Sequence, residues 1–308
     1  MGQTLNGFSK LDIHFEKKLV ETRLSELQTE NCKEETIKSM MRNFGLERAK
    51  EHGWPNTYVF TKAMGEMLVE NTKENLPIVI VRPTIISSTY KEPFPGWIEG
   101  VRTLDSFAIA YGKSKLTCFP GDIDAIVDVI PADMVVNTII MAMVANANQC
   151  YDNIYHVGSS IRNPLRYINL SDYAHKYFTE KPWMDKDRKP VKVNGRITYL
   201  DMASFQRYMF IHYLLPLKLV NTICCQHFQK MYLEVNKKIQ IMMRLADLYK
   251  PYLFFRGIFD DMNLEKLQVA ARQSGVEMDL FYLDPKMIDW EDYFINVHGP
   301  GIVKYLFK

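Results

Sequence analysis

The chain has 308 residues, of which 47% are hydrophobic and 24% charged, a balance typical of globular proteins with one large or two moderate domains. Its net charge of +2 shows no basic excess and argues against nucleic-acid binding. The first eighteen residues lack the apolar stretch of a signal peptide, so we predict an intracellular protein without a secretory signal.

Five cysteines follow no spacing typical of a disulfide framework or a zinc site: Cys32, Cys118, Cys150, Cys224 and Cys225. An odd number of irregularly spaced cysteines favours a reducing compartment. The seven histidines form no metal-spaced cluster either, and we therefore predict no metal site.

The first part of the chain is predicted to be helical. Two segments within residues 9–52 carry apolar residues at helical spacing. A third helix is predicted from Pro55 to about Asn75, with Asn56 as its N-cap. The stretch LPIVIVRPTII at 76–86 is an unbroken apolar run, which is typical of a parallel strand buried on both faces.

Helices and strands alternate beyond this strand, which Pro83 is expected to end. The prolines and glycines of SSTYKEPFPGWIEG at 87–100 predict a long loop. Strands are predicted within 124–130 and 153–160, on either side of a helix at 131–147. This alternation is typical of a doubly wound α/β fold with a parallel sheet.

The composition changes after residue 185, where the polar, basic linker DKDRKPVKVNGR leads into mostly helical sequence. We therefore predict two domains, residues 1–185 and 186–308. The run 209–225 is apolar, but a histidine, a proline and a lysine interrupt it and its uninterrupted length is too short to span a bilayer. We expect a helix buried in the second domain, and the alternative is an interfacial segment at a membrane surface.

The segment WPNTYVFTKAMGEM at 54–67 places Tyr58 and Lys62 four residues apart on the predicted third helix. Residues at this spacing share a helix face, so the Lys62 ammonium is expected near the Tyr58 phenol. A nearby cation favours the phenolate and lowers the pKa of a tyrosine from about 10 toward the range of a general acid. The same spacing also occurs by chance on solvated helix faces, and spacing alone leaves both interpretations open.

Several long stretches occur in an order that resembles the extended short-chain dehydrogenase/reductases. More narrowly, they resemble the alcohol-forming fatty acyl-CoA reductases of plants, the male sterility group. The resemblance runs through essentially the whole chain and rests on these segments: GWPNTYVFTKAMGEM (53–67), LPIVIVRPTII (76–86), EPFPGWIEG (92–100), DVIPADMVVN (128–137), KPYLFFRGIFDDMN (250–263) and DWEDYF (289–294). It implies an incomplete Rossmann-type parallel sheet that lacks its first strands, followed by a mostly helical C-terminal domain.

The resemblance implies two successive NADPH-dependent reductions, from long-chain acyl-CoA through a bound aldehyde to a primary fatty alcohol. It implies that Tyr58 protonates the developing alkoxide and that Lys62 holds the cofactor ribose. Three residues would line the nicotinamide end of the cofactor: Pro83, Thr84 and Ile85. The substrate side would include Pro93, Phe94 and Trp97, for which a surface loop shaped by prolines is the alternative.

Association with a membrane surface is a further expectation, at the endoplasmic reticulum or in a plastid. The sequence leaves the oligomeric state and the preferred acyl chain length open. His298, in the turn-like NVHGPG, is expected to have a local structural role, and a catalytic role is the alternative.

Two features of a complete reductase of this type are missing. None of the fifteen glycines has the spacing of a phosphate-binding glycine-rich turn, and the catalytic Ser or Thr of the family would precede this chain. We therefore expect an N-terminally truncated reductase. The alternatives are a catalytically inactive fragment or interaction chain and, less favoured by the matching segments, another extended reductase acting on a sterol or a sugar nucleotide.

Overall fold

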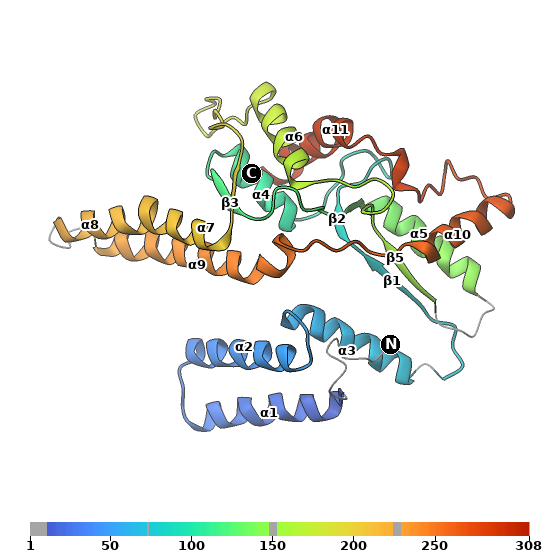
Figure 1. The fold of residues 1–308 in the computed structure, drawn as a ribbon, viewed down its shortest axis with the longest axis horizontal. Helices are drawn as coiled ribbons and strands as arrows, with labels where there is room; N and C mark the ends of the chain where they lie inside the picture. The colour runs from blue at the N-terminus through green and yellow to red at the C-terminus, as the bar shows by residue number, and fades with distance from the viewer. Residues whose placement is uncertain (1–10, 73, 148–152, 224–228, 308) are drawn as a thin grey trace. The chain divides into compact units, whose positions relative to one another are not determined.

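Helices and short parallel strands alternate along the chain in a computed structural model that describes residues 11–72, 74–147, 153–223 and 229–307 (Figure 1). The chain divides into two units, Met1–Ile78 and Val79–Lys308, and each is described by itself. The first unit contains α1 (Ile13–Thr29), α2 (Glu34–Glu51) and α3 (Thr57–Thr72), which confirms the helices predicted for this region.

Polar caps and one buried ion pair organise the first unit. The predicted cap, Asn56, accepts a hydrogen bond from the backbone N–H of Val59 at 3.1 Å through Oδ1. Buried Glu16 on α1 bonds Arg48 Nη2 on α2 at 2.5 Å and lies 3.0 Å from His52 Nε2. Burial raises the pKa of Glu16, but the hydrogen bonds from Arg48 and His52 outweigh it and hold that pKa below its ordinary value. The ion pair therefore ties the first two helices together.

Three pairs of parallel strands form the β-structure described in the second unit. They are β1 (Val79–Pro83) with β5 (Asn153–Val157), β2 (Ile85–Ser87) with β4 (Val129–Pro131), and β3 (Cys118–Pro120) with β6 (Thr198–Leu200). The parallel pairing and the α/β fold class confirm the predictions from sequence. Strands β3 and β6 were not predicted, and the strand expected within 124–130 begins only at Val129.

The apolar segment 76–86 is not one strand that ends at Pro83. It changes partner at Thr84, whose backbone N–H donates to Val157 O at 3.0 Å, while the N–H of Ile85 donates to Asp128 O at 3.0 Å. Proline lacks an N–H, but the residues after it still have theirs and bond a different neighbour. The chain therefore continues past Pro83 in extended form, into β2.

The helical elements of this unit pack around the strands and at their ends. They are α4 (Thr103–Gly112), α5 (Ala132–Asn146), α6 (Tyr167–Glu180), α7 (Met202–Met209), η1 (Phe210–Leu214), α8 (Leu215–Ile223), α9 (Gln229–Leu253), α10 (Met262–Gln273), η2 (Pro285–Met287), α11 (Trp290–Asp292), η3 (Tyr293–His298) and α12 (Gly299–Leu306). Helices α5 and α10 pack against each other and along β5 (Figure 1).

The main hydrophobic core combines strands with C-terminal helices. Val129 and Val157 are fully buried in the same cluster as Leu264 and Leu283. Strand β4 is buried throughout, whereas β1, expected to be buried on both faces, is only half-buried in this unit. Residues on both sides of position 185 therefore share one core, and the predicted division into 1–185 and 186–308 stays a prediction.

Helices α7, η1 and α8 lie antiparallel to α9 (Figure 1), and we call this arrangement the α7–α9 hairpin (described residues 202–223 and 229–253). Its inner face packs through Met209, Ile239 and Ala246. The prediction of a buried helix within 209–225 is wrong for the described residues 210–223, none of which is buried. The helix carries apolar side chains on all of its sides, but α9 covers only one of them.

Among the described helices, none has the length and the apolar character that crossing a membrane requires.

Candidate active site

Tyr58 and Lys62 lie near the start of α3, in the first unit, and both side chains are exposed. Lys62 Nζ lies 5.9 Å from the centroid of the Tyr58 ring, and Tyr58 is 64% exposed. The Asn56 cap sets where the helix begins, and the four-residue spacing then places both residues on the same face. The pair is accessible to a ligand, while its catalytic role stays a prediction.

Thr84 lies in the second unit, at the carboxyl end of β1, where the chain changes strand partner. Its Oγ1 is buried and has no hydrogen-bond partner among the described residues. The neighbouring Asp128 accepts the backbone N–H of Ser159 at 2.7 Å through Oδ1, while its Oδ2 is buried and equally unpaired. Ligands of parallel α/β sheets bind at this end of the strands.

Gly158 makes the close packing at this corner possible. A Cβ atom on Gly158 would lie 2.7 Å from both Thr84 Cγ2 and Asp128 Oδ1, closer than real contacts allow. We call Thr84, Asp128 and Gly158 the strand-end corner. Of the predicted cofactor residues Pro83, Thr84 and Ile85, the structure brings Thr84 into this corner, whereas Pro83 and Ile85 are exposed.

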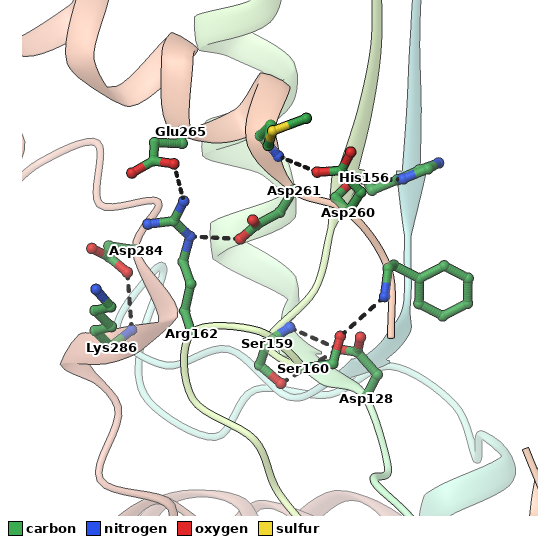
Figure 2. Close-up of polar contacts among 12 residues, drawn as sticks. Asp128, His156, Ser159, Ser160, Arg162, Asp260, Asp261, Glu265, Asp284 and Lys286 are labelled. Atoms are coloured by element: carbon green, nitrogen blue, oxygen red, sulfur yellow. Dashed lines mark hydrogen bonds and ion pairs between the residues drawn. The ribbon is translucent and has the colours of Figure 1, made fainter. Parts of the chain in front are cut away.

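The turn after β5 is held by the C-terminal segment that resembles the reductase family (Figure 2). Arg162 Nε bonds Asp261 Oδ2 at 2.5 Å, and its Nη2 lies 3.2 Å from Glu265 Oε2. On the strand itself, His156 Nδ1 lies 2.9 Å from the backbone oxygen of Asp260. The segment GIFDDMN therefore braces the backbone next to the strand-end corner.

A single carboxylate anchors the loop that carries the predicted substrate residues. Asp133, in the first turn of α5, accepts the backbone N–H groups of Tyr90 at 2.9 Å, Lys91 at 2.7 Å and Glu92 at 3.0 Å. It also accepts the hydroxyl of Tyr282, whose pKa is raised by burial and by this hydrogen bond. Four donors therefore meet one buried acceptor at a helix N-terminus, where negative charge is favoured.

The predicted substrate residues themselves, Pro93, Phe94 and Trp97, are all exposed on this loop. The rings of Phe94 and Trp97 meet edge to face with centroids 6.5 Å apart. Between them, Gly96 packs so closely on η3 that an added Cβ would lie 2.5 Å from Val297 O. The loop thus exposes an aromatic pair to solvent, while its backbone at Gly96 packs on η3.

A buried polar chain extends from the end of β2. Tyr293 donates its hydroxyl to Ser88 O at 2.7 Å and lies 2.8 Å from Ser87 Oγ. His298 Nδ1 lies 2.9 Å from Ser88 Oγ, and its Nε2 is 3.4 Å from Asp105 Oδ1. Burial lowers the pKa of His298 to about 4 and raises that of Asp105 to about 6, so at neutral pH a neutral imidazole faces an ionised carboxylate.

Sequence reasoning did not identify Asp128, Asp133 or this polar chain as part of a site. The sequence signal for the two aspartates is weak: each carboxylate interrupts an otherwise apolar segment, which indicates a buried polar group but not its partners. Their partners are far away in sequence, which no spacing pattern could reveal.

The parallel strand pairs and the helices between them define a protein of the Rossmann-type α/β class. Comparison with known families specifies it further. An NAD-binding family described as male sterility protein matches residues 14–139, and a second family with the same description matches residues 212–308.

Curated relatives agree with these family matches. The alcohol-forming fatty acyl-CoA reductase of Simmondsia chinensis is 52% identical over 99% of this chain and 63% of its own length. Fatty acyl-CoA reductase 1 of Arabidopsis thaliana is 47% identical over the whole chain and 63% of its own length. A further relative, fatty acyl-CoA reductase 7 of Arabidopsis thaliana, is 44% identical over 96% of this chain and 72% of its own length.

The chain belongs to the fatty acyl-CoA reductase family, as the resemblance predicted. It spans less than two thirds of the length of the first two relatives.

Proposed function

We propose that the protein to which this chain belongs reduces long-chain acyl-CoA with NADPH, through a bound aldehyde, to a primary fatty alcohol. The observation that carries the proposal is the exposed Tyr58–Lys62 pair on α3, in a family whose curated members are named for this reaction. The preference for NADPH over NADH rests on the resemblance of the sequence.

The bound cofactor would supply one hydride to each of the two reductions. In the first, the thioester carbon accepts a hydride and the CoA thiolate leaves, which produces the aldehyde. In the second, the aldehyde carbon accepts a hydride while Tyr58 donates its Oη proton to the developing alkoxide. Lys62 stabilises the resulting phenolate and positions the cofactor ribose.

The two unpaired atoms of the strand-end corner complement the polar group of a nicotinamide. A carboxamide has one acceptor oxygen and two N–H donors. Both unpaired atoms are buried, so this pairing requires the side chains that cover them to move aside. Thr84 Oγ1 would then donate to the oxygen, and Asp128 Oδ2 would accept from the nitrogen. Because Gly158 has no side chain, Thr84 and Asp128 can pack closely against its backbone.

The test is turnover with palmitoyl-CoA, measured as NADPH oxidation, release of CoA thiol and formation of fatty alcohol. We expect two NADPH oxidised per CoA released. Tyr58→Phe should lower kcat at least 100-fold and leave NADPH affinity unchanged, because only the transferable proton is removed. Tyr213→Phe, at another exposed tyrosine, is the control and should retain full activity.

Undiminished turnover by Tyr58→Phe would remove this residue from the mechanism. An unaltered chain that neither binds NADPH nor releases CoA would favour the alternative of an inactive fragment or interaction chain. The sequence feature behind that alternative is the lack of a glycine-rich phosphate-binding turn among its fifteen glycines.

We also propose that the α7–α9 hairpin lies on an anionic membrane surface, at the endoplasmic reticulum or in a plastid. The outward face of α9 carries an exposed apolar stripe at helical spacing: Ile241, Leu245, Leu248 and Tyr252. Residues 202–253 contain seven Lys or Arg and two Asp or Glu, a net charge of +5, against +2 for the whole chain. An apolar stripe with surrounding positive charge matches anionic headgroups over acyl chains.

Vesicle sedimentation tests this association. We expect binding to vesicles with 30% phosphatidylserine in phosphatidylcholine and weaker binding to phosphatidylcholine alone. The double variant Lys237→Glu, Lys238→Glu should lower the affinity about 30-fold or more, since each basic residue near the surface contributes about 1 kcal/mol. Equal binding to both vesicle types would refute the electrostatic part, and sedimentation with neither would refute the proposal. Fractionation of the tagged protein in cells tests the organelle.

A further inference from the structure

A cavity of about 100 Å³ lies in the second unit, apart from the strand-end corner and from the α7–α9 hairpin. Its wall combines residues of α4, α6, β3, β6 and the C-terminal helices η3 and α12. Aromatic rings dominate this wall, among them Phe107 and Phe119, whose centroids are 4.4 Å apart, and Tyr177 with Phe178 at 5.1 Å. Two small side chains, Ala108 and Ala174, leave room between the rings.

The chemistry of the lining excludes most parts of a cofactor or of CoA. Among the described residues, this lining contains no Lys, Arg, Asp or Glu, so phosphates would meet no opposite charge there. Burial lowers the pKa of His298 to about 4, so this residue also faces the cavity uncharged at neutral pH. The ligand that fits such a wall is an uncharged, apolar chain.

His298 links this cavity to the end of the strand segment. It lines the cavity, and its Nδ1 lies 2.9 Å from Ser88 Oγ. Ser88 follows Thr84 by four residues along the chain, immediately after β2. The cavity therefore lies next to the carboxyl end of β2, and one of its walls is η3, on which Gly96 of the loop with Phe94 and Trp97 packs.

We propose that this cavity receives the methyl-terminal part of an alkyl chain, and that it is the acyl-chain subsite of the reductase. The second half of this statement rests on the proposed function, whereas binding of an alkyl chain does not. A water-sized group needs about 10–15 Å³ of such volume, so the cavity accepts a segment on the order of seven methylene-sized groups. Ala108 on α4 and Ala174 on α6 then determine how far the chain reaches.

The experiment measures binding of 1-butanol, 1-hexanol, 1-octanol and 1-dodecanol to the full chain, by displacement of the fluorescent fatty acid cis-parinaric acid. We expect affinity to rise about fourfold for each added methylene until about seven carbons are buried, and to level off for longer alcohols. Ala108→Leu fills the cavity and should lower the affinity for 1-dodecanol at least tenfold. Ala145→Leu, the same substitution on the exposed side of α5, should leave it unchanged. Equal affinities for both variants would overturn the proposal.

A second measurement on the unaltered chain covers the case in which Ala108→Leu fails to fold. A 1-alkanol with a diazirine near its methyl end is photolysed in the complex, and the labelled peptides are identified by mass spectrometry. We expect labels within residues 104–119 and 167–178, which contain most of the cavity wall. Labels confined to the exposed hairpin helices, or a lack of saturable labelling, would overturn the proposal.

The two proposals fail separately in these experiments. Neither binding nor labelling needs cofactor or turnover, so an inactive chain can still show the alkyl subsite. Conversely, a chain that reduces palmitoyl-CoA but shows neither displacement nor cavity labels would retain the proposed function and lose this subsite.

Discussion

Substitution of Asp133 by asparagine should loosen the loop that carries the predicted substrate residues. The Asp133 carboxylate is buried and accepts three consecutive backbone N–H groups, those of Tyr90, Lys91 and Glu92, as well as the hydroxyl of Tyr282. Asparagine has nearly the same shape, but it has one acceptor oxygen and no charge. The change therefore tests the charge and the acceptors rather than the packing.

The expected loss of stability follows from the number of these bonds. A hydrogen bond to a charged group contributes about 1.5–3 kcal/mol, against about 0.5–1.5 kcal/mol for a neutral one, so each donor loses about 1 kcal/mol. With four donors, and with the Asn amide facing at least one N–H, we expect Asp133→Asn to lower the free energy of unfolding by about 3–4 kcal/mol.

Urea unfolding followed by circular dichroism measures this difference. Asp124→Asn, at an exposed position, is the matched control and should change stability by less than about 0.5 kcal/mol. A cycle with Tyr282→Phe should show a coupling above about 0.5 kcal/mol, because the two side chains are in contact. Faster proteolysis within residues 88–98 is also expected. A loss below about 1 kcal/mol for Asp133→Asn, or additive single effects, would refute the reasoning.

Two further predictions concern stability. Gly96→Ala combines a φ of +76° with a Cβ only 2.5 Å from Val297 O, whereas Gly100→Ala has the same φ and open space around its Cβ. In urea unfolding we expect the free energy of unfolding to fall by about 3 kcal/mol or more for Gly96→Ala and by about 1 kcal/mol for Gly100→Ala. Equal losses for the two variants would contradict the close contact at Gly96. The pH profile of unfolding contains two opposing contributions. The pKa of Asp105 is raised from 3.8 to about 6, so its contribution lowers the free energy of unfolding as pH rises from 3.8 to 6. The pKa of His298 is lowered from 6.5 to about 4, so its contribution raises the free energy of unfolding between pH 4 and 6.5. Asp105→Asn removes the opposing contribution, so its stability should rise more steeply from pH 4 to 6.5 than that of the unaltered chain, and parallel profiles would contradict this assignment.

The sequence by itself determined the local elements and the family. The N-cap at Asn56, the helices around it and the helix at 131–147 follow from cap residues and from apolar spacing within a few turns, and they are found within a few residues of the predicted bounds. The Tyr58–Lys62 arrangement is equally local, because a helix of any tertiary setting places these residues on one face.

Only the tertiary structure decided which residues are buried together. Apolar spacing at 210–223 looks the same whether a neighbour covers one side of the helix or all of it, and here α9 covers one side. Likewise, Asp133 meets Tyr282 and Ser88 meets His298 across 149 and 210 residues of chain. Such contacts depend on how strands and helices pack in three dimensions, whereas a pattern of spacing records only neighbours along the chain.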